Sequence, residues 1–236
     1  ASPVYRMRIS GPAPTGLTAL PKDNRPPNRE RGEAIIAGKW RFGAHTVETP
    51  PGHAPWGPPF PSLHFADRIH RFHWLRDVAA HGPNGEARAR SLTVAWVESF
   101  GKWESFAWRL GVTADRVINL MCAGPWLLGG IQGEARTALL DSLGRQLRHL
   151  QASSIDENDP GVRFRIGIAL SIAGAAIEDN QKALAAGLQI LEAECTTQIL
   201  ADGGHASRNP EALAEALLDI QAVEELLLRL GLVAPA

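Results

Sequence analysis

The sequence predicts an all-α fold of helical hairpins that follows an extended N-terminal arm. Three observations support this prediction. From Leu63 onward, apolar residues recur at steps of three and four, the spacing of one face of a helix. The first 62 residues are instead rich in Pro and Gly and mostly lack this periodicity. One stretch, residues 165–177, is apolar all round, which favours a helix buried on every side over a strand.

Residues 1–62 are predicted to form the arm, and residues 63–236 the helical domain. Within the arm, residues 31–40 have the composition of a short helix, and residues 39–48 that of a small hairpin. The arm ends in a Pro-rich loop, residues 49–62. Because so much proline prevents the arm from building a core of its own, we expect it to pack along the helical domain.

The helical domain is predicted to be a series of amphipathic helices joined by short turns. They cover residues 64–80, 86–103, 113–123, 134–150 and 165–177, followed by helices that begin near residues 181 and 210. Asn209 offers an N-cap for the last helix, Pro210 fits its first position, and Gly231 lies just past its end. A bundle, a solenoid or a closed α/α toroid would satisfy this pattern, and the absence of a fixed repeat disfavours the solenoid.

Charge is unevenly distributed along a chain whose formal net charge is only -1. Residues 1–118 hold 16 Lys and Arg against 10 Asp and Glu, whereas residues 119–236 hold 8 against 15. The basic first half leaves open an anionic ligand or an ordinary solvated surface. The two cysteines, Cys122 and Cys195, lie in apolar helical stretches and are interpreted as buried thiols. With no apolar run long enough to span a bilayer, we expect a soluble protein of the periplasm or cytoplasm, and no nucleic-acid partner.

Several catalytic motifs are absent, namely the P-loop, the GxSxG elbow, HExxH and paired CxxC. A first cluster that could bind a ligand surrounds His70 and His73, which lie three residues apart and share a helix face with Trp74 nearby. No Asp or Glu recurs at metal-ligand spacing, so a basic surface is favoured over a metal site and no metal is predicted in this chain.

A second cluster combines aromatic and polar residues. Trp96, Trp103 and Trp108 precede Arg116 and Asn119. Such a mixture suits sugars that carry carboxylates, because Trp stacks on the sugar ring and Arg makes a two-pronged contact with the acid. The alternative is that most of these tryptophans fill helix interfaces, which would leave one or two at a ligand cleft.

A third cluster is the segment ADGGHASRNP, residues 201–210, between two strongly periodic helices. Two glycines permit tight backbone geometry, and His205 and Arg208 follow them on a loop that leads to a helix N-terminus. A simple connector would need neither His nor Arg, so a functional site and a plain turn are both retained for this loop.

Several segments resemble the heparinase II/III-like polysaccharide lyases, in the same order along the chain. The most specific is LEAECTTQILADGGHASRNPEALAEALLDI, residues 191–220. FHWLRDVAA, WVESFGKWESFAWRLG, DSLGRQLRHL and the opening SPVYRMRISGPAP are similar to other parts of the same proteins. The resemblance implies an incomplete α/α toroid and, after it, a β-sandwich domain that is absent from this chain.

The resemblance also implies β-elimination of acidic polysaccharides that contain uronic acids. That reaction needs a group that neutralises the carboxylate, a base for the C5 proton and an acid for the leaving oxygen. The implied partners are an acidic polysaccharide or oligosaccharide and the protein's own β-sandwich domain. No cofactor is implied in this chain, whereas a divalent metal in the further domain is compatible with the family.

The sequence departs from the family at the catalytic positions. The Asn-His pair that neutralises the carboxylate corresponds to Ala175 and Ala176, and the proton-transferring Tyr corresponds to Ala212. The chain has one tyrosine, Tyr5, in the arm. The predicted catalytic residues are therefore His205 and Arg208, and the predicted substrate-binding residues are Asn209, Arg116, Asn119, Trp108, Trp103 and Trp74.

Three functions follow as hypotheses. The first is a lyase whose catalytic roles are redistributed, with this chain alone expected to be inactive. The second is a non-catalytic carbohydrate-binding toroid that acts in polysaccharide assembly or export. The third is a helical interaction scaffold without affinity for sugars. The alanines at residues 175 and 212 favour the second hypothesis, and the His205–Arg208 segment favours the first.

Overall fold

The computed structural model describes residues 2–57, 59–178 and 180–232. These residues form helices and one small sheet, which confirms the predicted all-α class. In chain order the elements are α1 (Pro3–Ile9), α2 (Arg29–Ile36), β1 (Lys39–Phe42), β2 (His45–Glu48), α3 (Leu63–His70), α4 (Trp74–Ala79), α5 (Gly82–Phe100), α6 (Leu110–Leu127), η1 (Leu128–Gly130), α7 (Gly133–Ser153), η2 (Ser154–Asp156), α8 (Pro160–Ala176), α9 (Gln181–Gln198) and α10 (Pro210–Arg229).

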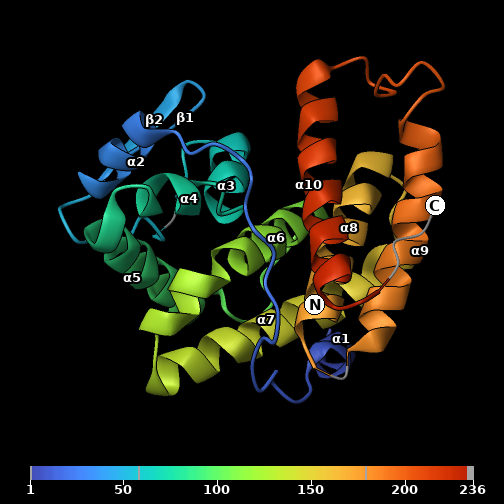
Figure 1. Cartoon of the computed structure of the whole chain (residues 1–236). Coiled ribbons are helices and arrows are strands. Elements are labelled where there is room, and N and C mark those ends of the chain that lie inside the picture. Colours follow the sequence, from blue (N-terminus) through green and yellow to red (C-terminus); the bar gives the residue numbers. More distant parts are fainter. Residues whose placement is uncertain (1, 58, 179, 233–236) are drawn as a thin grey trace.

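The elements form two groups joined by α6 and α7 (Figure 1). One group holds α2, the β1–β2 hairpin, α3, α4 and α5, and the other holds α8, α9 and α10. Two hydrophobic cores correspond to the groups. The first group encloses a core rich in aromatic residues, including Trp40, Trp56 and Trp96. The core of the second group is aliphatic and centred on α8, which is buried on all sides as predicted.

Helix α8 packs closely against α9 because small residues line their contact. A Cβ atom added to Gly174 would lie 2.2 Å from the backbone nitrogen of Leu184, and one added to Gly187 would lie 2.5 Å from that of Ser171. Both distances are too short for any side chain, so the two glycines allow the backbones to approach. This contact fixes α9 against the buried helix.

The predicted hairpin and the last helix have the expected form. Strands β1 and β2 pair antiparallel, with Trp40 opposite Val47. The side chain of Asn209 accepts a hydrogen bond from the backbone of Glu211, and Gly231 has a φ of 68° just after α10. The local patterns that predicted these features were therefore reliable.

Other boundaries differ from the prediction. The single helix expected over residues 64–80 is divided into α3 and α4 at Phe72, whose φ is 65°. Burial of the Phe72 ring in the aromatic core holds this backbone conformation. Residues 3–9, expected to be extended, form α1 after an N-cap at Ser2, and α6 continues through Pro125 to Leu127.

The N-terminal segment packs against the helices along its length. After α1, residues 10–28 run between the two groups of helices to reach α2 (Figure 1). The backbone NH of Thr18 donates to the carbonyl of Ala176 at 2.8 Å, and Arg229 donates to the carbonyl of Leu20 at 3.2 Å. Ile35 and Trp40 belong to the aromatic core. The division of the chain at residue 62 stays a prediction.

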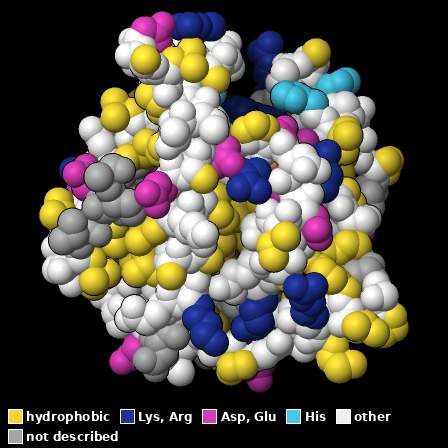
Figure 2. Space-filling view, turned by 90° about the vertical axis from the view of Figure 1, so that its right-hand side faces the viewer, with side chains coloured by type: hydrophobic (Ala, Val, Ile, Leu, Met, Phe, Trp, Pro, Cys, Tyr) yellow, Lys and Arg dark blue, Asp and Glu magenta, His cyan; other side chains and the backbone are white. Residues whose placement is uncertain are grey.

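The outer face formed by α9 and α10 carries hydrophobic side chains scattered among charged ones (Figure 2). Leu217 and Leu228 of α10 are more than half exposed. Single exposed leucines of this kind are common on protein surfaces and carry no functional argument. Among the described residues, no helix combines the length and the apolar character needed to cross a membrane.

Candidate functional site

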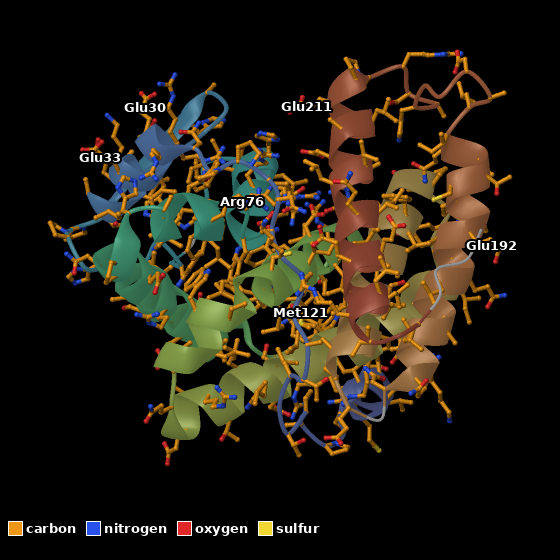
Figure 3. All side chains as sticks on the ribbon, viewed as in Figure 1. Glu30, Glu33, Arg76, Met121, Glu192 and Glu211 are labelled. Atoms are coloured by element: carbon orange, nitrogen blue, oxygen red, sulfur yellow. The ribbon has the colours of Figure 1, made fainter. Side chains whose placement is uncertain are left out.

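Charged side chains gather where the two groups of helices meet. Figure 3 shows Arg76 in this central region, between α4 and α10. We call this set the central charge cluster; its members come from the N-terminal segment and from α4, α6, α8, α10 and the α3–α4 junction, and they are Asp23, Arg25, Arg71, His73, Arg76, Asp115, Arg165, Glu215 and Asp219. Ion pairs link these residues into two parts, and Asn119, which accepts a hydrogen bond from Arg76 and donates one to the carbonyl of Asp115, lies between the parts.

Asp115 of α6 lies at the centre of one part of the cluster. Its side chain is 1% exposed and pairs with Arg71 and, at 2.7 Å, with Arg165. His73 Nε2 lies 3.7 Å from the same carboxylate. Burial opposes ionisation of Asp115, but the cationic neighbours, Arg165 first, outweigh it and lower its pKa to about 2. Asp115 is therefore a permanent anion that positions two arginines.

Arg25 lies at the centre of the other part. Its guanidinium donates to Asp219 Oδ1 at 3.0 Å and to Asp23 Oδ1 at 2.8 Å. Arg76 binds the second oxygen of Asp23 at 2.9 Å and donates to Asn119 Oδ1 at 2.5 Å. Burial raises the pKa of Asp219 to about 6 despite Arg25. The N-terminal segment thus joins α4, α6 and α10 through charged side chains.

A pocket of about 120 Å³ adjoins the cluster between α8, α10 and the loop that joins α9 to α10. Its polar lining includes Arg165, His205, Glu215 and Asp219, and Phe164 and Ala212 contribute apolar surface. Arg165 NH2 lies 3.3 Å from Glu215 Oε2, and the two side chains are 31% and 46% exposed. An anionic group entering the pocket would meet the guanidinium of Arg165. The second carboxylate partner of Arg165, Glu215, is exposed enough to turn into solvent.

Of the two predicted catalytic residues, the structure brings one to this pocket. His205 is held by a backbone bridge to Ile199, and its Nδ1 lies 2.8 Å from Ser207 Oγ. Arg208 is not among the lining residues: its φ is 55° and it pairs with Asp202 at 2.6 Å, with 64% of its side chain exposed. The loop therefore presents His205 to the pocket and Arg208 to solvent.

A sugar-binding role would require Arg116 to lie at a cleft, but Arg116 lies in the core. Its guanidinium is buried, donates to Gln146 and to the carbonyls of His70 and Ala107, and lies 4.4 Å from the centre of the Trp96 ring. Burial lowers its pKa to about 9. With its donors occupied inside the protein, Arg116 has none to offer a sugar.

The other predicted sugar-binding residues are also mainly structural. Trp74 and Trp108 are 1% exposed, and Asn119 is 3% exposed and hydrogen-bonded to Asp115 and Arg71. Trp103 is partly exposed but packs edge-on against Tyr5, with ring centres 6.5 Å apart. Asn209 caps α10. Trp74 and Trp108 thus fill helix interfaces, which was the alternative interpretation of the tryptophans in the sequence.

His70 and His73 do not form a metal site. His70 Nδ1 accepts a hydrogen bond from Trp96 Nε1 at 2.8 Å inside the aromatic core, whereas His73 lies beside Asp115. Burial lowers the pKa of each imidazole to about 3, so both are neutral at physiological pH. Within the described ranges, no group of three His, Cys, Asp or Glu residues is placed to bind a metal ion.

Most residues of the central charge cluster could not be recognised from the sequence. Asp23, Arg25, Arg165 and Asp219 come from separate elements, and no spacing links them. One usable indication was present: Arg165 begins the otherwise apolar stretch of residues 165–177. A charge at the edge of a buried helix often has a buried partner, and here the partner is Asp115.

The pair of positions that corresponds to the Asn-His pair of the lyases lies far from the position that corresponds to their Tyr. Ala212 lines the pocket beside the first turns of α8, whereas Ala176 lies at the far end of α8, where Thr18 binds its carbonyl. Eleven residues separate Arg165 from Ala176, which corresponds to about 16 Å along the helix. The pocket is therefore lined by the position of the Tyr, Ala212, and not by Ala175 or Ala176.

Fold and site together define a helical toroid with a charged central region, and comparison with solved structures shows the same fold. The chain is similar to a mutant of the heparan sulfate lyase HepC from Pedobacter heparinus, with a TM-score of 0.61, 18% identity, and coverage of 97% of this chain and 39% of that chain. A second structure of the lyase gives a TM-score of 0.53 at 17% identity, covering 96% and 42% of the two chains. The predicted incomplete toroid is confirmed.

Among curated proteins, the chain is similar to FtsZ-localized protein C of Caulobacter vibrioides. The identity is 32% over 233 residues, which cover 98% of this chain and 40% of the relative. No family model matches the chain. The chain thus spans about two fifths of the length of the proteins it resembles.

Proposed function

We propose that this chain is the helical domain of a heparinase II/III-like protein and that its pocket binds the acidic group of a uronic-acid-containing oligosaccharide. The observation that carries the proposal is the position of Arg165. Its guanidinium is fixed by buried Asp115 and is still 31% exposed at a pocket that His205 also lines. A fixed, partly exposed guanidinium suits two-pronged binding of a carboxylate or sulfate.

The ligand acid would displace the exposed carboxylate of Glu215 from Arg165. That pair is long, at 3.3 Å, and solvated, so its loss costs little. His205 would add a hydrogen bond, and Phe164 would contact an apolar part of the sugar. Binding thus requires no rearrangement of the buried Asp115 pairs.

We propose binding without catalysis by this chain. β-Elimination needs the three roles described above, and the implied positions hold Ala175, Ala176 and Ala212. The single tyrosine cannot replace the missing one: Tyr5 donates to His149 Nδ1 at 2.5 Å, while His149 Nε2 donates to the carbonyl of Trp108. This pair fixes α1 on α7, away from the pocket.

The test is calorimetric titration of the chain with size-defined heparin and alginate oligosaccharides. We expect Arg165→Gln to weaken binding at least tenfold, about 1.4 kcal/mol, because the fixed cation is lost. Arg163→Gln is the matched control, since it removes the same charge from the same helix. Arg163 pairs with Glu194 and not with Asp115. The control should bind within twofold of the unmodified chain.

Two results would overturn this proposal. One is the absence of binding to any acidic oligosaccharide, and the other is equal loss in the two variants after circular dichroism has shown that both are folded. In parallel, absorbance of the unsaturated uronate product measures elimination. We expect no product from the chain, and a rate that depends on His205 would restore the lyase hypothesis.

A second candidate function follows from the relative named for its localisation with FtsZ. Similarity over 98% of this chain supports a shared cellular site, so we propose that the protein containing the chain localises with FtsZ. A fluorescent fusion imaged in native cells together with labelled FtsZ tests this. Coincident bands are expected, and an even distribution in cells with normal FtsZ bands would contradict it.

A further inference from the structure

A second group of cations lies in a groove between α2 and β1. The groove has a volume of about 400 Å³ and is lined by Arg31, Lys39 and Arg41, with Glu30 as its acidic lining residue. Lys39 and Arg41 alternate along β1 with buried Trp40 and Phe42, so both cations lie on its exposed face. The hairpin thus presents two cations from an anchored strand.

The base of the groove is held rigidly. Arg31 Nε donates to Asp77 Oδ2 at 2.6 Å, and the other oxygen of Asp77 accepts from the backbone of Asn28 at 2.7 Å. A Cβ atom added to Gly32 would lie 2.1 Å from the carbonyl oxygen of Asp77, which shows how closely α2 packs on α4. The buried carboxylate of Asp77 therefore fixes the guanidinium of Arg31, and 31% of the Arg31 side chain remains exposed.

The positive charge of the groove is largely uncompensated. Within the described ranges, no carboxylate oxygen lies within 4.0 Å of the cationic nitrogens of Lys39, Arg41 or Arg68. Burial, followed by the nearby charges of Arg31 and Arg71, lowers the pKa of Arg68. A groove that leaves two of its lining cations, Lys39 and Arg41, without a carboxylate partner favours an anionic ligand.

Arg68 connects this groove to the candidate site. It lies on α3, which packs against both β1 and α6, and on α6 Asp115 joins Arg71 to Arg165 at the pocket. The cations on these packed elements are Arg165, Arg71, Arg68 and Arg31, with Lys39 and Arg41 in the groove, and we call this set the cationic row.

We propose that the α2–β1 groove is a second anion subsite and that the cationic row binds one acidic sugar chain along its length. This inference rests on the proposed function, because the pocket at Arg165 supplies the first subsite. A single sugar would occupy one end of the row, whereas a chain of several sugars would contact both subsites. Affinity should then rise with chain length until both are filled.

The experiment is titration of the chain with heparin fragments from disaccharide to dodecasaccharide. We expect the double variant Lys39→Ala/Arg41→Ala to bind the disaccharide within twofold of the unmodified chain and the dodecasaccharide at least tenfold more weakly. The matched control is Arg6→Ala/Arg8→Ala, which removes two cations from α1, at the opposite end of the molecule (Figure 1). The control should lose less than twofold at every length.

Each other outcome is informative. If the double variant binds the dodecasaccharide as the unmodified chain does, while Arg165→Gln does not, the second subsite is wrong and the proposed function stands. If the double variant loses disaccharide binding to the same degree, two separate subsites do not exist. If the unmodified chain binds no fragment of any length, the proposed function itself fails.

Discussion

At the scale of single residues, Asp115 determines the geometry of the candidate site. It is buried on α6, and it fixes arginines from two other elements, Arg71 after α3 and Arg165 on α8. Because Arg165 lines the pocket, Asp115 positions the cation of the first proposed subsite, whereas Asp77 holds Arg31 in the second. An arginine held in this way loses little conformational entropy when it binds a ligand.

Removing this charge should be costly. Asp115→Asn leaves two partly buried guanidinium groups without their anion, so we expect a loss of about 3 kcal/mol in the free energy of unfolding, measured in urea. Asp141→Asn is the control, because Asp141 pairs with Arg145 on the surface of α7 with 35% of its side chain exposed. That control should lose less than about 1 kcal/mol. Equal losses would show that Asp115 is not a special anchor.

At the scale of elements, the close contact of α8 with α9 holds the pocket walls in place. Residues of α8 line the pocket at one end of the helix, and Gly174 lies near the other end against Leu184. The loop that carries His205 follows directly from α9. A change in the separation of the two helices would therefore move His205 relative to Arg165.

This contact leaves no room for a methyl group. We expect Gly174→Ala to lower the free energy of unfolding by about 2 kcal/mol, because the Cβ atom would overlap the backbone of α9. Gly129→Ala is the control, since a Cβ atom there meets nothing within 4 Å. Thermal unfolding of the two variants measures the difference. A stable Gly174→Ala variant with unchanged oligosaccharide affinity would contradict the proposed tightness of the contact.

At the scale of the whole molecule, buried histidines make stability depend on pH. Burial lowers the pKa of His70 and His73 to about 3 and that of His149 to about 4. Each of these groups stabilises the fold above the pKa of about 6.5 that histidine has in the unfolded chain, and loses that contribution as the pH falls. Asp219 acts in the opposite direction, because its raised pKa of about 6 favours the fold at low pH.

We expect the folded chain to lose stability steeply as the pH falls from about 6 to 4. Over this range the unfolded chain holds protons on three histidines, and the folded chain holds one on Asp219, so the difference is about two protons. That corresponds to roughly 2.7 kcal/mol per pH unit. Urea unfolding at several pH values measures the slope.

The His149→Gln variant is the control for this slope. It retains an acceptor for Tyr5 and a donor for Trp108 but removes one titrating group, so the slope should fall to about one proton. A stability that does not change between pH 6 and 4 would contradict the assignment of neutral buried histidines.

The sequence by itself determined the local structure and the fold class. Periodicity located the helices, Asn209 and Gly231 marked the limits of α10, and the apolar stretch of residues 165–177 identified the buried helix. These features depend on neighbours within a few residues, so local patterns suffice. Local patterns do not indicate the break at Phe72, because burial of its ring in the tertiary structure maintains it.

Only the tertiary structure decided which residues form the site. Asp23, Asp115, Arg165 and Asp219 are far apart in the sequence, and a charged residue in an amphipathic helix reads as solvated until its partner is known. Arg116 directly follows Asp115 in the sequence. Arg116 donates all its hydrogen bonds inside the core, whereas Asp115 orients partly exposed cations. Adjacent residues of a helix point about 100° apart, and what they meet depends on packing between distant elements.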